Sequence, residues 1–151
     1  MKLIPLTKGM FAMVDDADYP VLSRFKWHAS KDGKTFYPQN VNFGRMHSVL
    51  VTACKPLEVD HIDRNGLNNQ RSNLRICTHQ QNNWNQGKKK PGTSKYKGVS
   101  WFPARKKWMA KMRIKGKNTH LGCFQNEDDA AKCYDKHAAL HFGEFACFNF
   151  R

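Results

Sequence analysis

Acidic residues, long apolar runs and paired cysteines are all scarce in this chain, and each absence excludes a class of protein. No stretch approaches the roughly 20 apolar residues of a membrane span. The apolar run at the N-terminus is short and contains Pro5, so no secretory signal is expected. The five cysteines are odd in number and form no Cys-x-x-Cys pair, which argues against a structural zinc site and favours reduced thiols in a cytoplasm.

The shortage of acids leaves the chain strongly basic. Twelve Asp and Glu side chains face 26 Lys and Arg, for a formal net charge of +14. Residues 86–151 carry 15 of the basic and 5 of the acidic side chains, so most of the excess lies in the C-terminal part. Such a charge favours a polyanionic partner, although it does not by itself distinguish DNA from RNA.

One segment places an acid and an imidazole side by side within a recognisable pattern of elements. Asp60 ends an alternating apolar and charged run, 57–60, that is typical of a short strand, and His61 follows it directly. Residues 64–66 have the chemistry of a turn, and a second alternating run follows at 73–77. The sequence therefore predicts a strand, a polar loop and a second strand.

A short helix is predicted directly after the second strand, because Thr78 and Gln81 fit a capping box. Asn82 on this helix and Asp60 at the end of the first strand would then face a single metal ion. Carboxylate and amide oxygens suit magnesium-like ions, and a neutral His61 can act as a general base near pH 7. The alternative interpretation is that the Asn-rich segment satisfies only its own backbone through Asx turns.

Over about residues 44–85, the order and spacing of these side chains resemble an HNH nuclease site of the ββα-metal type. The resemblance implies that Asp60 is an acidic metal ligand, that His61 is the catalytic base and that Asn73 pins the loop between the strands. Arg75 or a nearby Lys would steady the phosphate. A divalent cofactor, Mg²⁺ or another ion such as Mn²⁺, and double-stranded DNA as substrate are implied as well.

The resemblance also assigns the second metal ligand to the predicted helix. Asn82 lies nine residues after Asn73 and matches best, followed in preference by Asn83 and then by His79. An Arg-x-His segment that contains His47 precedes the Asp-His pair, and this histidine is expected to pack beneath the site.

The C-terminal part has the pattern of three strands and one helix. Residues 97–102, 107–114 and 118–124 alternate apolar side chains with Lys and Arg, as strands with one buried face do. Asn126 is a suitable N-cap for a helix that begins with three acids, and Gly143 is a suitable stop.

Segments 96–101, 107–114, 120–124, 126–135 and 143–150 together resemble the DNA-binding domain of plant ethylene-response factors. This Apetala-type domain also occurs fused to HNH nucleases of phages and mobile elements, and it places its sheet in the major groove. The resemblance implies a set of basic and aromatic DNA contacts on the sheet and its turns: Trp101, Arg105, Lys107, Trp108, Lys111, Arg113 and His120. Core packing is the alternative interpretation for the two tryptophans.

The sequence thus predicts an α+β protein with two domains. Residues 1–85 would form the nuclease domain, in which a β-rich leader at 1–43 completes the core around the ββα-metal motif at 44–85. Residues 95–151 would form a three-stranded antiparallel sheet packed on one α-helix, after a basic linker at 86–94. The linker contains three further candidate DNA contacts: Lys88, Lys89 and Lys90. A solvated tether is the alternative role for this linker.

The predicted function is a metal-dependent DNA endonuclease of the homing type, which hydrolyses phosphodiester bonds with its N-terminal domain and is targeted by its C-terminal domain. A non-catalytic DNA-binding or transcription-regulating protein with a degenerate HNH fold is the main alternative, and an RNA-binding protein is a third. We expect a monomer without a membrane partner, in the cytoplasm, from a bacterial host or encoded by a phage.

Overall fold

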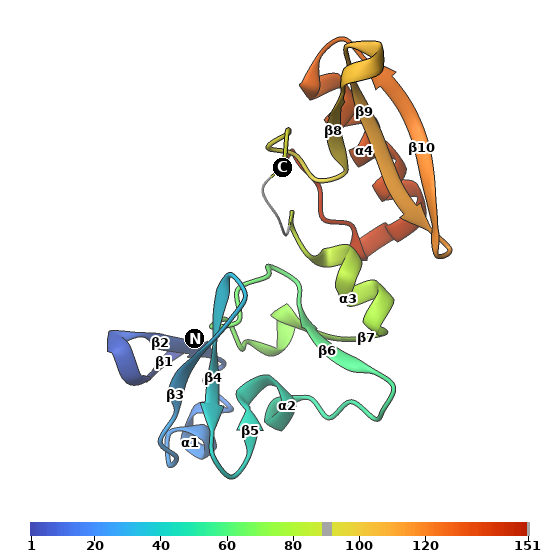
Figure 1. The fold of residues 1–151 in the computed structure, drawn as a ribbon. Helices are drawn as coiled ribbons and strands as arrows, with labels where there is room; N and C mark the ends of the chain where they lie inside the picture. The colour runs from blue at the N-terminus through green and yellow to red at the C-terminus, as the bar shows by residue number, and fades with distance from the viewer. Residues whose placement is uncertain (89–91, 151) are drawn as a thin grey trace. The chain divides into compact units, whose positions relative to one another are not determined.

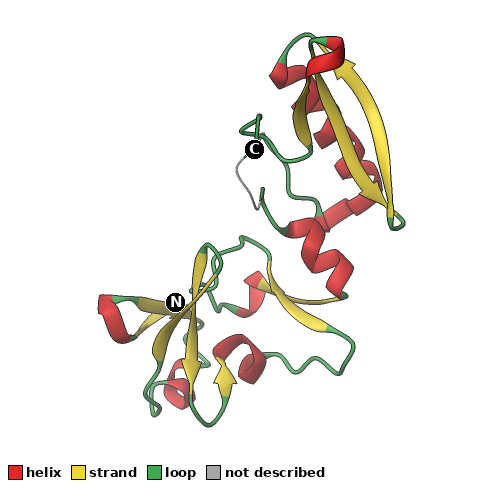
Figure 2. Cartoon of the chain, in the orientation of Figure 1, coloured by secondary structure: helices red, strands yellow, loops and turns green. Residues whose placement is uncertain are grey.

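The computed structural model describes residues 1–88 and 92–150 (Figure 1). These residues divide into two compact units, Met1–Asn82 and Asn83–Arg151. Small antiparallel sheets and short helices make up both units, so the protein has a mixed α/β fold (Figure 2). In the described part of the chain, no helix is long and apolar enough to cross a membrane.

The first unit begins with a two-stranded antiparallel ribbon of β1 (Lys2–Pro5) and β2 (Phe11–Val14), joined through a 3₁₀ turn at Thr7–Gly9. One face of the ribbon is buried in the core of the unit, because Ile4, Ala12 and Val14 are each at most 2 % exposed. The opposite face is exposed at Leu3 and Phe11.

A three-stranded sheet, β3 (His28–Asp32), β4 (Thr35–Asn40) and β5 (Gly44–Arg45), packs into the same core. Two short helices accompany it, α1 (Tyr19–Leu22) and α2 (Met46–Leu50). The indole of Trp27 anchors the end of α1, because its Nε1 donates a 2.9 Å hydrogen bond to the carbonyl oxygen of Leu22. Residues 1–43 are therefore rich in β-structure, as the sequence predicted.

The polar segment forms a second ribbon, in which β6 (Glu58–His61) pairs antiparallel with β7 (Leu74–Cys77). Helix α3 (His79–Asn85) follows directly. The expected capping box is present at its start. The Gln81 side chain accepts a 2.8 Å hydrogen bond from the backbone N–H of Thr78, and the Thr78 hydroxyl accepts one from the backbone of Gln81. The predicted order of strand, loop, strand and helix is confirmed.

The loop between β6 and β7 is held against the rest of the first unit. The backbone N–H groups of Met13 and Asn69 form 2.8 Å hydrogen bonds with the carbonyl oxygens of Leu67 and Met13, respectively. Gly66 lies so close to β4 that an added Cβ would approach the ring of Tyr37 to 2.6 Å. A side chain at position 66 would therefore push this loop away from the sheet.

The second unit contains a three-stranded antiparallel sheet in the order β8 (Val99–Phe102), β9 (Lys107–Ile114) and β10 (Lys117–Phe124). A bulge interrupts the β9–β10 register between His120 and Gly122. All three strands lie where the alternating pattern predicted them, within two residues at each end.

Helix α4 (Glu127–Phe142) covers one face of this sheet (Figure 1). Its small side chains allow a close approach, since Ala130, Ala131 and Ala138 are fully buried. Asn126 occupies the N-cap position as predicted, but its amide donates to the carboxylate of Asp129 instead of capping a backbone N–H group. The helix ends at Gly143, which has a positive φ of 52°.

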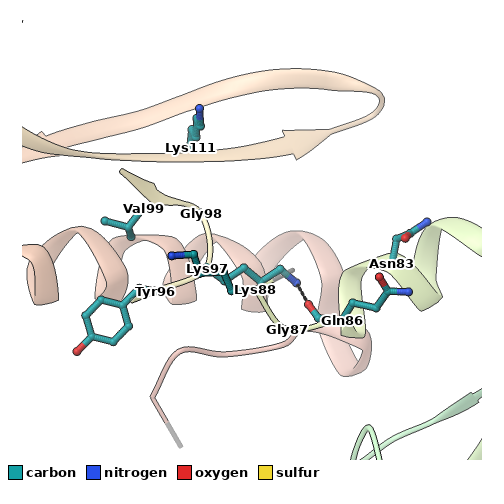
Figure 3. Close-up of a pocket in the computed structure, with 9 residues that line it drawn as sticks. All are labelled: Asn83, Gln86, Gly87, Lys88, Tyr96, Lys97, Gly98, Val99 and Lys111. Carbon is teal, nitrogen blue, oxygen red and sulfur yellow. Dashed lines mark hydrogen bonds between the residues drawn. The ribbon is translucent and has the colours of Figure 1, made fainter. Parts of the chain in front are cut away.

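The C-terminal end of α3 belongs to the second unit. The indole of Trp84 stacks on the ring of Phe142, with 4.5 Å between centroids and 15° between planes. The ammonium group of Lys97 donates 2.6 Å hydrogen bonds to the carbonyl oxygens of Trp84 and Gln86. Figure 3 shows this lysine and Gln86 in the wall of a pocket of about 300 Å³, whose lining also includes Tyr96.

Candidate functional site

The β6–β7 ribbon sorts the side chains of the candidate site onto two faces. Successive residues of a strand point to opposite sides, so Glu58 and Asp60 share one face of β6 while His61 points to the other. Cross-strand partners share a face, which places Arg75 beside Asp60 and Cys77 beside Glu58. The acid and the imidazole that are adjacent in sequence therefore have different surroundings.

Asp60 forms a buried ion pair with Arg75. The Nε and Nη2 atoms of the guanidinium lie 3.0 and 2.8 Å from Oδ2 of the carboxylate, and the side chains of Asp60 and Arg75 are 7 % and 10 % exposed. The sequence predicted that Arg75 contacts a phosphate, whereas its guanidinium here neutralises the proposed metal ligand. An unpaired carboxylate at this depth would be costly, and the pairing with Arg75 offsets part of that cost.

His61 is enclosed by aromatic rings and an amide. Its ring packs edge-on against Tyr37 and His47, with centroids 5.6 and 4.9 Å away. Its Nε2 lies 3.4 Å from Oδ1 of Asn69. Burial lowers the pKa of His61 below its usual value of 6.5, so the imidazole is neutral at neutral pH. The neutral ring is the form that accepts a proton from water.

His47 packs against His61, as expected from the Arg-x-His segment. It is 7 % exposed, and burial, followed by the neighbouring His61 and Arg45, lowers its pKa to about 3. Within residues 1–88 and 92–150, its Nδ1 is buried without a hydrogen-bond partner. A proton on that nitrogen would therefore create an unsatisfied charge, which accounts for the direction of the shift.

Asn73 ties the two ends of the loop together. Its Nδ2 donates to Oδ1 of Asp63 at 2.9 Å and to the carbonyl oxygen of Asn68 at 2.8 Å, while its Oδ1 accepts from the backbone N–H of Asp63 at 3.0 Å. Its carbonyl oxygen also accepts a 2.9 Å hydrogen bond from Ile62, the residue after His61. These hydrogen bonds hold Asn73 against Asp63 and Asn68, and the pinning role that the resemblance implied for it stays a prediction.

Asn69 is a site residue that the sequence did not single out. It is fully buried, and its Nδ2 donates to the carbonyl oxygen of Gly66 at 3.1 Å, which directs Oδ1 toward His61. Because Oδ1 can only accept, the contact favours a proton on Nε2 of His61. Several asparagines crowd this segment, and nothing in their spacing distinguishes the one that contacts the imidazole.

Glu58 is the second site residue that the sequence missed. Its Oε2 accepts a 2.8 Å hydrogen bond from Nδ2 of Asn82, and its Oε1 lies 2.8 Å from Nδ1 of His79. These two contacts, that of Asn82 first, lower the pKa of Glu58. Two of the three candidate metal ligands on α3, Asn82 and His79, are thus held by one carboxylate on β6.

The thiol of Cys77 lies on the same face of the ribbon as Glu58 and Asp60. Burial, followed by the charges of Asp60 and Glu58, raises the pKa of Cys77 to about 11, and the backbone N–H of Asn82 acts in the opposite direction. In the parts of the chain that the structure describes, no three His, Cys, Asp or Glu residues form a cluster that could hold a metal ion.

The predicted DNA contacts of the second unit lie on both faces of its sheet. The register pairs Trp101 with Trp108 on the side of Val99 and Ala110, which face α4, and Trp108 packs against that core. The expectation that both tryptophans share the outer face with the basic residues is therefore wrong, and core packing accounts for Trp108. Trp101 stays partly exposed, at 36 %, at the edge of the sheet.

The basic candidates lie on the outer face or at its ends. Lys111 and Arg113 are exposed on β9, and His120 is the cross-strand partner of Lys111. Arg105 is in the turn after β8, with its guanidinium 5.8 Å from the ring centre of Phe102. Lys107 is on the same face as Lys111 and is half-buried; Lys88 donates to the carbonyl oxygen of Ser94. The predicted contacts Lys89 and Lys90 lie outside the described residues.

A family model of HNH endonucleases matches residues 55–84, which contain the Asp-His pair together with Asn69, Asn73 and Asn82. The chain is also 35 % identical over 150 residues to the "Uncharacterized HNH endonuclease L560" of Acanthamoeba polyphaga mimivirus. This match covers 94 % of the chain and 76 % of the viral protein. The chain belongs to the HNH endonuclease family. As a member of this family, it is a nuclease that acts on DNA.

A second relative of this HNH endonuclease is "Protein 3.8" of Escherichia phage T7. The two are 36 % identical over 90 residues, which make up 60 % of the chain and 74 % of the phage protein. No solved structure matches the chain.

Proposed function

We propose that this HNH endonuclease hydrolyses phosphodiester bonds of duplex DNA with a divalent metal, in a ββα-metal motif formed by β6, β7 and α3. Asp60 and Asn82 would be the protein ligands of the metal, and His61 the general base. The observation that carries the proposal is the arrangement around the end of β6. There, Glu58 shares a face with Asp60 and accepts a hydrogen bond from the side chain of Asn82, and a neutral, buried His61 follows Asp60 directly.

The donor atoms fit a hard divalent cation. Asp60 offers a carboxylate and Asn82 an amide oxygen, and oxygen donors suit Mg²⁺ or Mn²⁺. Mg²⁺ in nuclease and polymerase sites usually has only one or two protein carboxylates and completes its shell with water and substrate phosphates. A site with two protein ligands is thus compatible with these residues. Such an ion, when bound, offsets charge on the phosphate and on the leaving 3′ oxygen.

Arg75 and His61 would supply the remaining groups. The guanidinium of Arg75 neutralises Asp60 in this structure, and with a cation beside Asp60 it would be available to a phosphate oxygen. The neutral imidazole of His61 would take a proton from the attacking water. Asn69 would orient the ring of His61, and Asn73 would fix the backbone that carries it.

We assign DNA targeting to the C-terminal sheet, in line with its resemblance to the ethylene-response-factor domain. The basic residues of its outer face are the proposed contacts: Arg105, Lys107, Lys111, Arg113 and His120. The two tryptophans are removed from this set, because they lie on the side that faces α4. Residues 1–85 would cut and residues 95–151 would bind, with 86–94 between them.

A plasmid-cleavage assay tests the proposed chemistry. Supercoiled plasmid should be nicked or cut with Mg²⁺ and left intact with EDTA. His61→Ala should reduce the cleavage rate by about 10²–10⁴ and leave DNA affinity in a gel-shift assay near the wild-type value, because loss of a general base has that typical cost. Wild-type cleavage by the variant would refute the role of His61. Equal cleavage in EDTA would refute the metal.

A further inference from the structure

The carboxylate of Glu58 contacts two side chains of helix α3. It lies two residues before Asp60 on the same face of β6 and is 37 % exposed. Each of its oxygens meets a side chain of α3: Oε2 meets Nδ2 of Asn82, and Oε1 meets Nδ1 of His79, both at 2.8 Å. The carboxylate therefore links the first strand of the motif to its helix.

The contact with Asn82 fixes which way its amide points. An ionised carboxylate only accepts hydrogen bonds, and within an amide only the nitrogen donates. Nδ2 of Asn82 must therefore face Glu58, and Oδ1 points away from it. A metal ion binds an amide through its oxygen, so a flipped Asn82 would offer the ion a nitrogen without an available lone pair.

We propose that Glu58 is a positioning residue that presents Oδ1 of Asn82 to the divalent metal; this inference rests on the metal-ligand role of Asn82 in the proposed function. Glu58 acts through the amide and is not a ligand itself, since both of its oxygens are engaged by α3.

The same contact distinguishes Asn82 from its neighbour. Successive residues of an α-helix are about 100° apart around the axis, so Asn83 does not share the direction in which Asn82 meets Glu58. Glu58 thus selects the ligand that the sequence spacing had ranked first.

Direct metal binding to the full-length protein tests this role without reference to cleavage. Mn²⁺ is titrated into the protein, and free Mn²⁺ is measured by electron paramagnetic resonance. Glu58→Leu should weaken Mn²⁺ binding about 10–100-fold, as losses of outer contacts to metal ligands typically do. Glu144→Leu, which removes an equal charge from an exposed position in the second unit, should leave Mn²⁺ affinity unchanged.

A double variant separates positioning from other roles. In Asn82→Asp, oxygens occupy both ends of the side chain, so no orientation is required. The loss of Mn²⁺ affinity caused by Glu58→Leu should therefore shrink from about 10–100-fold to about threefold or less when it is measured against Asn82→Asp alone, a comparison that cancels the added charge of the aspartate. An equal loss in the wild-type and Asn82→Asp backgrounds would overturn the proposal. If Glu58→Leu does not fold by circular dichroism, Glu58→Ala is compared in the same two backgrounds.

The metal-ligand role of Asn82 and the positioning role of Glu58 can be tested separately with single variants. If Asn82→Ala binds Mn²⁺ as tightly as wild type, Asn82 is not a ligand and the metal site itself is misassigned. If Asn82→Ala weakens binding and Glu58→Leu does not, the site stands and the positioning role of Glu58 is refuted. A larger loss in Asn83→Ala than in Asn82→Ala would move the ligand by one residue and refute both.

Discussion

The two units of this HNH endonuclease differ in where their polar side chains lie: many are buried in the first unit, whereas those on the sheet of the second unit are exposed. In the first, Asp60, His61, Asn69 and Asn73 are each at most 8 % exposed and contact one another or partners within the same unit. In the second, the buried residues under the sheet are mostly alanines and aromatics, while Lys111 and Arg113 are exposed. Chemistry benefits from groups that are fixed and removed from water, whereas binding to a phosphate backbone requires accessible charge.

Separating the two units should have the largest effect of the changes considered, and it should act on DNA affinity. A chain of residues 1–88 with Trp84→Gln, which avoids an exposed indole after the loss of Phe142, should lose on the order of a hundredfold in DNA affinity, because several phosphate contacts disappear. Slow nicking with Mg²⁺ should persist. Gel shifts and plasmid nicking measure the two properties, and thermal melting checks the fold. Undiminished DNA affinity would contradict the assignment of binding to the sheet.

Neutralising the exposed sheet face should have a smaller and more specific effect. Lys111→Ala with Arg113→Ala should reduce the magnitude of the slope of log affinity against log salt concentration by roughly 1.8. Each phosphate contact formed on binding releases about 0.9 counterion, and this variant lacks two such contacts. Fluorescence anisotropy over a salt series measures this slope. Lys132→Ala with Lys136→Ala removes the same charge from exposed positions of α4 and is the matched control. Equal slopes in both double variants would remove the sheet face from the interface.

The buried histidines should make the first unit sensitive to acid. The pKa of His47 is lowered from 6.5 to about 3 in the folded chain, so the unfolded chain takes up the proton first as the pH falls. The free energy of unfolding should therefore decrease between about pH 6.5 and pH 3, by at most about 1.4 kcal/mol per pH unit for this one group. Urea unfolding at several pH values measures it. In His47→Leu the slope should be shallower; an unchanged slope would show that His47 does not cause it.

The elements of both units could be predicted from the sequence because their signals are local. The run that ends at Asp60 has the period of a strand, and the Thr78–Gln81 pair forms the capping box that begins α3. The strands of the C-terminal sheet were equally evident. Each of these signals depends on residues within a few positions of one another, and no knowledge of packing is needed to read it.

Local sequence patterns could not predict which face of the C-terminal sheet is covered by α4. The C-terminal strands carry large apolar side chains on both sides: Trp101 and Trp108 point toward α4, while Phe102 and Met109 share the opposite face with Lys111. The alternation fixes which residues share a face, but only the packing of α4 decides which face is covered. The tryptophans were therefore placed on the wrong side.

The side-chain contacts within the site could not be predicted from the sequence either. Asn69 and Glu58 reach His61 and Asn82 across 8 and 24 residues, respectively. Arg75 is directed to Asp60 by the register of the β6–β7 ribbon, which depends on the length and conformation of the loop. The resemblance named the groups of the motif, whereas these supporting residues depend on the fold of this chain.

The contacts of helix α3 determine where the chain could be cut and joined to a different C-terminal domain. Asn82 near its middle belongs to the motif that the family model matches, and Trp84 two residues later is stacked on Phe142 of the second unit. The carbonyl oxygens of Trp84 and Gln86 are in turn capped by Lys97. A crossover inside α3 would separate an indole from its stacking partner and a helix end from its cap. A graft that gives this nuclease a new DNA-binding domain should therefore join after Gln86 and replace the aromatic ring and the cation that Phe142 and Lys97 provide.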